Sequence, residues 1–407
     1  ESNVQCEIIA IGTELLLGQI QDTNSSWLGE NLALIGVDNY YQSKIGDNEE
    51  RIVDALKLAL SRSDAIICCG GLGPTQDDIT REAIAKATDS QLFLDEIVAD
   101  KIKHMFSSRG RHMTPNNLKQ AMIPKGGRAI EDQPGTAPGI LFPFKGKVIY
   151  AVPGVPYELK QIMRSTILPD LKKRSGSTKI IKSRTLRTWG HTESKLAELL
   201  ESKIKQLNDS ENTTLAFLAS GIEGLKLRIT VKGENESEIV RQLDSEEKNI
   251  RSIIGDVVFG VNNETIEQRI LKNLQDENLT LSTVEIATDG LASTRLGKVD
   301  SNGRYFKGCI IPKSELSKKQ LLRHTQMENN FSETKRLADA VRNFFDSNIG
   351  LAITYSDKEG VNHLAISSKN ILIEDTMKLP GDGVRVSQFS VITALNLLRL
   401  QIENDLI

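Results

Sequence analysis

The chain has 407 residues, which is enough for two to four ordinary domains. With 39% hydrophobic and 26% charged residues, its composition is that of a globular protein. The 51 Lys and Arg residues nearly balance the 54 Asp and Glu residues, so the net charge of -3 gives no general attraction to nucleic acid or to an anionic membrane.

The pattern of cysteines and of apolar runs indicates in which cellular compartment the protein is expected. The four cysteines form no C-x-x-C motif, and Cys68 and Cys69 would point to opposite faces of one strand, which disfavours a zinc site or a disulfide framework. No run approaches the roughly 18 apolar residues of a membrane-spanning helix. The first residues also lack the basic-then-apolar form of a signal peptide. We therefore expect a cytoplasmic protein with reduced thiols.

The first part of the chain alternates strands and helices. The predicted strands cover 6–12, 64–71 and 147–152, and the predicted helices cover 24–36, 48–61, 95–122 and the residues after Pro156. Short apolar strands between amphipathic helices are typical of a parallel sheet covered on both faces, with ligands at the carboxyl ends of its strands. We place this α/β domain at 1–172, and a basic, Gly/Ser-containing linker follows it.

The next region, 173–260, has the pattern of a small α+β domain. Predicted strands at 180–190 and 224–233 alternate with helices at 192–207 and 234–254. The segment "GIEG" has the outline of the GxxG loop by which KH domains hold nucleic-acid phosphates. Because the acidic Glu223 lies inside it and no basic helix follows, we favour a scaffold and expect no nucleic-acid binding.

A third α/β pattern covers 261–407. Its predicted helices are 265–278, 314–323, 332–347 and 387–403, and its predicted strands are 279–288, 349–356 and 362–368. The sequence therefore predicts a three-domain α/β chain.

The stretch "GGLGPTQDDITREA" follows the second predicted strand. Its glycines Gly70, Gly71 and Gly73 allow close approach of a ligand, and Thr75, Thr80 and the amides of a helix expected near Asp78 can donate to an anion. Asp77 and Asp78 can recruit a divalent cation or position a water. The alternative is a glycine-rich turn with one aspartate capping the helix, and this segment alone does not decide between them. It matches neither a dinucleotide fingerprint nor a P-loop.

Two further loops are expected at the same edge of the sheet. After the first strand come Gly12, Thr13, Glu14 and Asn24; after the third come Pro153, Gly154 and Pro156. This convergence predicts a functional site. Asn116 and Asn117 could contact a substrate, although capping or surface roles are the favoured interpretation.

The segments "IGTELLLGQIQDTNS", "GGLGPTQDDITREA" and "VPGVPYE" resemble the N-terminal domain of the CinA family (competence/damage-inducible protein A), which is related to the molybdopterin-binding fold of MogA, MoaB and MoeA. The resemblance covers essentially the whole chain. It implies a molybdopterin-binding-like domain, a KH-like domain and a C-terminal deamidase-like domain, and by analogy a homodimer. It also implies nucleotide binding, with a metal-dependent ADP-ribose pyrophosphatase activity in some members.

This resemblance assigns roles to individual residues. Asp78 corresponds to the acidic residue that contacts metal or pterin in the molybdopterin-binding relatives. Glu14 and Asp78 are therefore the expected ligands of a divalent metal, Mg²⁺ or Co²⁺, and with Asp77 the expected catalytic residues. The three loops would hold the nucleotide through the following residues: Gly12, Thr13, Asn24, Gly70, Gly71, Gly73, Thr75, Thr80, Pro153, Gly154 and Pro156.

The third domain departs from the family pattern. Family members that hydrolyse the amide of nicotinamide mononucleotide carry an E-S-C-T-G-G segment with a serine nucleophile, and the matching stretch here reads "EIATDG". Ile286 replaces that serine and cannot attack a carbonyl. Thr288, Ser293 and Thr294 could in principle substitute, but structural roles are favoured. We expect the amidase activity to be absent.

Two functions remain open from the sequence. The first is an enzyme that hydrolyses ADP-ribose to AMP and ribose 5-phosphate with a divalent metal. The second is a nucleotide- or pterin-binding protein without turnover, acting as an interaction module in competence or DNA-damage physiology.

Overall fold

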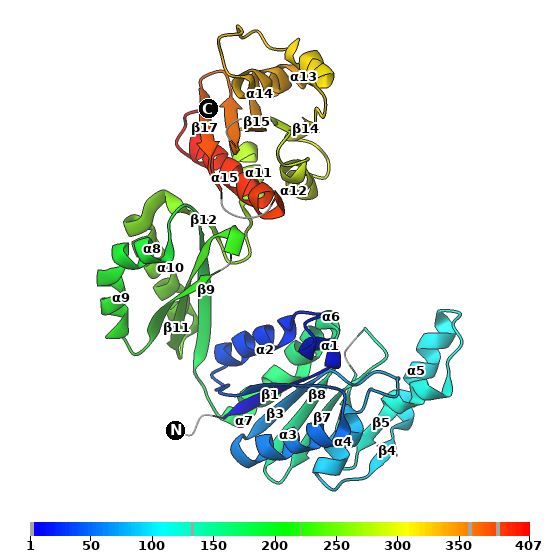
Figure 1. The fold of residues 1–407 in the computed structure, drawn as a ribbon. Coiled ribbons are helices and arrows are strands. Elements are labelled where there is room, and N and C mark those ends of the chain that lie inside the picture. The colour runs from blue at the N-terminus through cyan, green and yellow to red at the C-terminus, as the bar shows by residue number, and fades with distance from the viewer. Residues whose placement is uncertain (1–3, 132–133, 220, 357–359, 380–382) are drawn as a thin grey trace. The chain divides into compact units, whose positions relative to one another are not determined.

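The computed structural model describes residues 4–131, 134–219, 221–356, 360–379 and 383–407 (Figure 1). The chain divides into two compact units. Unit 1 comprises Glu1–Ile181 with Gly233–Glu236, and unit 2 comprises Lys182–Lys232 with Ser237–Ile407. Among the described residues, no helix is both long enough and apolar enough to cross a membrane.

Unit 1 is built on a six-stranded sheet in the order β2-β1-β3-β8-β7-β6. The first four strands are parallel, and β7 and β6 run antiparallel to their neighbours. The strand bounds are β1 Cys6–Ile11, β2 Gln42–Ile45, β3 Ala65–Cys69, β6 Arg128–Ile130, β7 Gly139–Phe144 and β8 Lys147–Val152. The predicted parallel sheet is confirmed, and the antiparallel edge strands were not predicted. A separate ribbon pairs β4 (Leu92–Leu94) with β5 (Met122–Pro124).

Helices cover both faces of this sheet because its central strands are apolar on both sides. In β1, Ile8 packs into one core and the next residue, Ile9, into the other. The first core contains residues of α2, α6 and α7, and the second contains residues of α3 and α4. The helix bounds are α1 Thr13–Leu16, α2 Thr23–Leu34, α3 Glu49–Arg62, α4 Thr80–Ala87, α5 Glu96–Ser108, α6 Pro156–Ile162 and α7 Leu168–Ser175, with a π-helical turn, η2, at Met163–Ile167.

The strand order places a topological switch point beside β1. After β1 the chain forms β2 on one side of it and then β3 on the other. In open α/β sheets, the crevice outside the carboxyl ends of two such strands is the usual place for a ligand. The loops that begin at Gly12, after β1, and at Gly70, after β3, border this crevice.

The single helix predicted over 95–122 is wrong. Helix α5 ends at Ser108, and a short 3-10 helix, η1, covers Pro115–Ala121. Gly110 has a left-handed backbone with φ of 61°, which ends the helical path, and Pro115 starts the next turn at its favoured first position.

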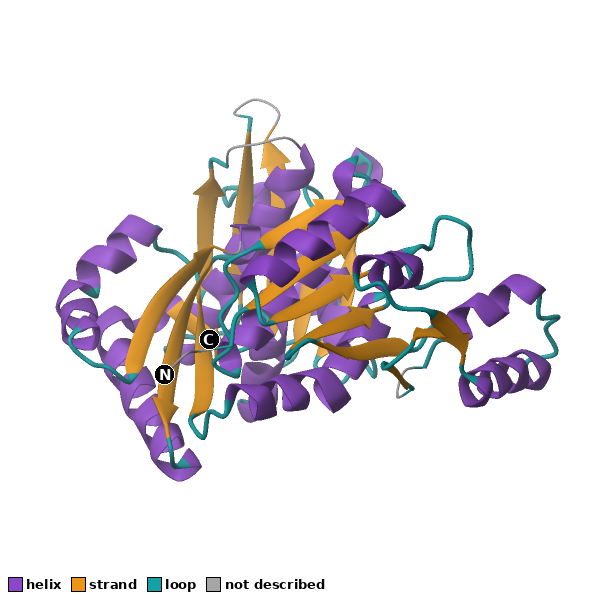
Figure 2. Cartoon of the chain, turned by 90° about the horizontal axis from the view of Figure 1, so that it is seen from below, coloured by secondary structure: helices purple, strands orange, loops and turns teal. Residues whose placement is uncertain are grey.

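Unit 2 contains two sheets. Figure 2 distinguishes the helices, strands and loops of the chain by colour. The four-stranded sheet has the order β10-β11-β9-β12, and the five-stranded sheet has the order β14-β13-β15-β16-β17. Its strands are β9 Ile180–Thr188, β10 Thr213–Ala219, β11 Leu225–Gly233, β12 Val258–Val261, β13 Leu281–Glu285, β14 Phe306–Ile310, β15 Ile349–Ser356, β16 Val361–Ser367 and β17 Leu372–Met377. Its helices are α8 Glu193–Leu199, α9 Glu201–Asn208, α10 Glu236–Ile254, α11 Ile266–Asp276, α12 Leu291–Val299, α13 Glu315–Leu322, α14 Glu333–Phe344 and α15 Gly383–Glu403, with 3-10 turns η3 Gly221–Glu223 and η4 Gly255–Val257.

Candidate functional site

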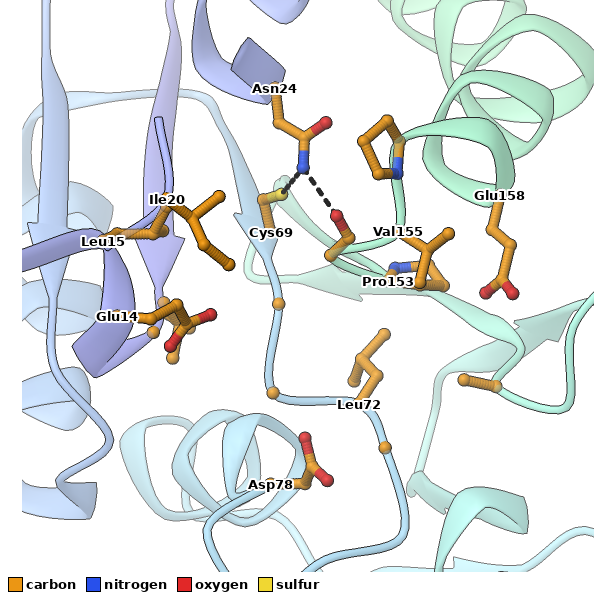
Figure 3. Close-up of a pocket in the computed structure, with 18 of the residues that line it drawn as sticks. Glu14, Leu15, Ile20, Asn24, Cys69, Leu72, Asp78, Pro153, Val155 and Glu158 are labelled. Carbon is orange, nitrogen blue, oxygen red and sulfur yellow. Dashed lines mark hydrogen bonds between the residues drawn. The ribbon is translucent and has the colours of Figure 1, made fainter. Parts of the chain in front are cut away.

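A cavity of about 640 Å³ lies at the carboxyl ends of the parallel strands in unit 1 (Figure 3). All three predicted loops contribute to its lining. The predicted residues that line it are Gly12, Glu14, Asn24, Gly70, Gly71, Gly73, Thr75, Asp77, Asp78, Pro153, Gly154 and Pro156. The convergence expected from the sequence is therefore present in the structure.

The glycine-rich loop lies against the end of β1 and the start of α4. Gly70 has φ of 104°, and a Cβ there would overlap the carbonyl oxygen of Ile11. Gly71 has φ of 68°, and its Cβ would overlap the Thr80 hydroxyl. These two positions require glycine both for backbone conformation and for space. Their compactness brings the loop backbone to the cavity surface.

Thr75, Asp77 and Asp78 form one hydrogen-bonded turn beyond the glycines. Oδ2 of Asp78 accepts from the Thr75 amide at 2.9 Å and from the Thr75 hydroxyl at 2.5 Å, and Asp77 Oδ1 faces the same hydroxyl. The hydrogen bond from the Thr75 hydroxyl is the largest of the effects that lower the pKa of Asp77. Helix α4 begins only at Thr80, and its N-cap residue makes no side-chain cap, so neither aspartate caps this helix.

Two of the predicted contact residues, Thr13 and Thr80, lie outside the described cavity lining. Thr80 is fully buried, and its hydroxyl donates to the Gly70 carbonyl at 2.7 Å. Thr13 forms two hydrogen bonds with Asp47. The Thr13 amide donates to the Asp47 carboxylate at 2.9 Å, and the Thr13 hydroxyl accepts from the Asp47 amide at 3.0 Å. Neither threonine is part of the cavity lining as described. Both hold loops in place, because backbone groups at these strand ends need partners.

Asn24 and Asn117 have different roles in the structure. The Asn24 Nδ2 donates to the carbonyl of Gly154 at 2.8 Å and to Cys69 Sγ at 3.5 Å, so it ties the start of α2 to the loop after β8 (Figure 3). The Gly154 carbonyl can only accept, which fixes which way the Asn24 amide faces. Asn117 forms a capping box with Thr114 at the start of η1, which agrees with the favoured interpretation.

The structure adds acidic residues that were not predicted as site residues. Asp22, Asp47 and Glu158 also line the cavity. Asp47 follows β2, a short strand that the sequence pattern did not reveal. Glu158 belongs to the segment "VPGVPYE", so a signal for it was present. Burial raises the pKa of Glu158.

The described lining carries a strong negative charge. It contains the carboxylates of Glu14, Asp22, Asp47, Asp77, Asp78 and Glu158, and no Lys or Arg. The nearby Lys119 is held by the loop backbone and by an ion pair: its ammonium donates to the carbonyls of Thr75 and Asp78 and pairs with Glu82 at 3.3 Å. Arg81 is fully buried and donates to the Leu72 carbonyl, and this burial lowers its pKa to about 10.

The donor set fits a hard divalent cation that is shared with a ligand. Carboxylate oxygens are the preferred protein ligands of Mg²⁺. The described residues contain no group of three or more His, Cys, Asp or Glu side chains close enough to hold a metal alone. Mg²⁺ commonly binds one or two carboxylates, several waters and the phosphates of its substrate, and a cavity with several separate carboxylates suits that mode.

The segment "EIATDG" in unit 2 has no group positioned as a nucleophile at its second residue. Ile286 packs against an apolar cluster that includes Val284 and Ala352. The Thr288 hydroxyl donates to the buried carboxylate of Glu285 at 2.8 Å, and the Thr294 hydroxyl donates to the Gly290 carbonyl at 3.0 Å. The two threonine hydroxyls thus have structural partners.

The fold defines an α/β domain with a cavity at the carboxyl ends of its parallel strands, followed by a unit that contains a four-stranded and a five-stranded sheet. Family models match the chain segment by segment: the model described as "Probable molybdopterin binding domain" matches residues 7–173, the KH domain of damage-inducible protein CinA matches 183–260, and the CinA C-terminal domain matches 263–402. A CinA-like protein of Dictyoglomus turgidum is 34% identical over 412 residues, covering 97% of this chain and 98% of its own. The chain belongs to the CinA family.

Two other similar proteins extend the comparison. A protein of Thermoanaerobacter pseudethanolicus named as competence-damage inducible is 34% identical over 408 residues, covering 97% of both chains. The crystal structure of a CinA protein of unknown function from Thermoplasma acidophilum is 34% identical, with a TM-score of 0.39, and covers 42% of this chain and 98% of its own.

Proposed function

We propose that unit 1 hydrolyses ADP-ribose, or a closely related nucleotide diphosphate, to AMP and ribose 5-phosphate with a divalent metal. The observation that carries this proposal is the lining of the cavity. Six carboxylates and no described Lys or Arg surround a space at the switch point of a parallel sheet. An anionic diphosphate enters such a site only with a cation, so binding and metal dependence follow from one feature.

The reaction requires a water and a broken P–O bond. The water oxygen forms a bond to one phosphorus, the bond from that phosphorus to the bridging oxygen breaks, and two phosphomonoesters leave. When bound, the metal neutralises charge on the diphosphate oxygens. The Glu14 carboxylate lines the cavity, while the hydrogen bond of this residue with the Gln19 amide is made by its backbone carbonyl, so we assign the carboxylate the role of taking the proton of the water. Asp78 is the proposed metal ligand, held in orientation by Thr75.

Release of AMP tests this proposal directly. The protein is incubated with ADP-ribose and Mg²⁺ or Co²⁺, and AMP is measured by chromatography. We expect Asp78→Asn and Glu14→Gln each to lower the rate about 100-fold or more, because each removes a charged group that acts in the reaction. Glu50→Gln, an exposed carboxylate of α3, is the matched control and should leave the rate unchanged.

The outcome also separates the two functions. If the wild-type protein releases no AMP under any metal condition, the enzyme is excluded. Nucleotide binding measured in the same samples without AMP release would instead favour a binding protein without turnover.

For unit 2 we propose that amidase activity towards nicotinamide mononucleotide is absent. Support comes from Ile286, which packs into an apolar cluster where the family pattern has its serine. We expect no ammonia above background when the protein is incubated with nicotinamide mononucleotide, measured by a coupled ammonia assay. Clear release would show that another residue supplies the nucleophile and would overturn this proposal.

A further inference from the structure

Two carboxamides that line the cavity have buried oxygen atoms without a partner. Gln120, at the end of η1, is 2% exposed, and its Oε1 has no hydrogen-bond partner among the described residues. Asn24 uses its Nδ2 for the Gly154 carbonyl, and its Oδ1 is likewise buried without a partner. Buried acceptors in folded proteins nearly always find a donor, so each such oxygen calls for an explanation.

A second carboxamide of the same short helix provides a comparison. Asn117 is 9% exposed, and its Oδ1 accepts from both the amide and the hydroxyl of Thr114, at 3.0 and 2.9 Å. It lies outside the described lining. Of the two buried carboxamides of η1, the one away from the cavity, Asn117, serves the fold, whereas the Oε1 of the one that borders the cavity, Gln120, accepts from no described protein group. A buried acceptor without a donor lowers the stability of the protein, and Gln120 can be explained if a bound ligand supplies the missing donor.

The chemistry of the two oxygens restricts what that partner is. A carboxamide oxygen only accepts, so it needs an N–H or O–H group. An ionised diphosphate has acceptor oxygens only and cannot provide one. The ribose hydroxyls and the exocyclic amino group of adenine are donors. The nucleoside part of a nucleotide therefore matches these groups, while the carboxylates serve the metal and diphosphate part.

Apolar side chains of the same cavity support a nucleoside. Ile20 and Val155 line the cavity and are 58% and 54% exposed; Leu15 lies beside Ile20, and Val155 lies across the cavity from both (Figure 3). Large apolar groups at a cavity wall are suited to the flat face of a base or to a sugar ring. The cavity thus combines an apolar wall, acceptor oxygens and carboxylates, as an amphipathic nucleotide requires.

We propose that Gln120 binds the nucleoside part of the ligand through a hydrogen bond to its carboxamide, and that Asn24 contributes a second acceptor. This inference rests on the proposed nucleotide site, and it identifies the side chains that bind the nucleoside. Gln120 is then a binding residue that selects the ligand, separate from the carboxylates that act on the diphosphate.

The test uses the full chain and the variant Gln120→Met, which keeps the length of the side chain and removes its amide. Because an unpartnered buried group is removed, we expect the midpoint of thermal unfolding without nucleotide to rise by about 2 to 4 °C. Because a ligand contact is lost, we expect the affinity for AMP with Mg²⁺, measured by calorimetric titration, to fall about tenfold. Gln120→Leu should change both quantities in the same directions.

The matched control is Asn117→Leu in the same helix. It removes a carboxamide that caps η1, so the unfolding midpoint should fall while the affinity for AMP stays within twofold of wild type. Opposite signs of stability and binding at Gln120 distinguish a ligand-binding role from a structural one. Titration with IMP then separates the two donors: loss of discrimination between AMP and IMP in Gln120→Met indicates the amino group, and an equal loss for both indicates a ribose hydroxyl.

Several results would overturn the inference. Equal affinity of wild type and Gln120→Met for AMP would do so while leaving the proposed function intact. A lower unfolding midpoint in both Gln120→Met and Gln120→Leu would show that the carboxamide stabilises the protein without nucleotide and has a structural role. If wild type binds neither AMP nor ADP-ribose, the proposed function fails and this inference fails with it.

Discussion

Gly70 illustrates how single residues shape the site. Its backbone has φ of 104°, and the space where a Cβ would lie is taken by the carbonyl oxygen of Ile11. Gly146, in the turn between β7 and β8, has φ of 78° but no heavy atom within 4 Å of that position. The two glycines therefore separate the effect of backbone conformation from the effect of close packing.

We predict that Gly146→Ala lowers the free energy of unfolding by about 1 to 2 kcal/mol, the cost of a left-handed conformation alone. Gly70→Ala should lower it by about 3 kcal/mol or more, because β1 or the loop must also move. Urea titration of both variants gives the comparison. Equal losses would mean that the loop relieves the contact with Ile11 at no cost.

At the same scale, the sequence predicted the site residues whose position follows from local pattern. The glycines and the acids Glu14, Asp77 and Asp78 follow apolar strands directly, so their place at one edge could be inferred. Gln120 could not be found this way. It lies on a 3-10 helix far from those strands in sequence, and only the packing of η1 brings it to the cavity.

Among the elements, helix α14 is fixed by one carboxylate. Asp339 accepts hydrogen bonds from the Thr325 hydroxyl at 2.7 Å, from the Gln326 amide at 3.3 Å and from Arg342 at 3.0 Å. Burial alone would raise its pKa, but the hydrogen bonds and the nearby Arg342 outweigh that effect and lower the pKa of Asp339. The helix is thereby tied to the segment that follows α13.

This lowered pKa predicts a pH dependence of stability. A carboxyl whose pKa is lower in the folded state stabilises the protein above its unfolded value of about 4 and loses that contribution as the pH falls through the folded value. Asp339→Asn should cost about 1 to 3 kcal/mol at neutral pH, and less below about pH 4. Urea titrations across pH 3 to 7 measure this. Asp276→Asn, an exposed aspartate at the end of α11, should show no such trend.

How far elements could be predicted depended on their length and burial. The buried strands β1, β3 and β8 appeared as apolar runs, and long helices such as α3 appeared through their periodicity. Short strands such as β2 and β6 did not, because three or four residues carry too little pattern. The same limitation hid Asp47, whose place in the site depends on β2.

Across the whole molecule, the three domains that the family models match are distributed over two compact units. The KH-like segment and the C-terminal segment form one unit. Arg295 of α12 joins them: it pairs with Glu223 of the "GIEG" turn at 3.0 Å and with Glu267 of α11 at 2.7 Å. Ile222 of the same turn packs against the apolar core of the C-terminal segment. The turn that resembles a phosphate-binding loop is therefore engaged by the chain itself.

The pairing of Glu223 with Arg295 has a consequence for recombination between related genes. Removing the arginine would leave two carboxylates facing each other at the junction, and removing Glu223 would leave a half-buried guanidinium short of a partner. A gene that exchanged only its last third with a relative would break this match unless the donor carried the same pair. The two segments should therefore be inherited together, as a single module.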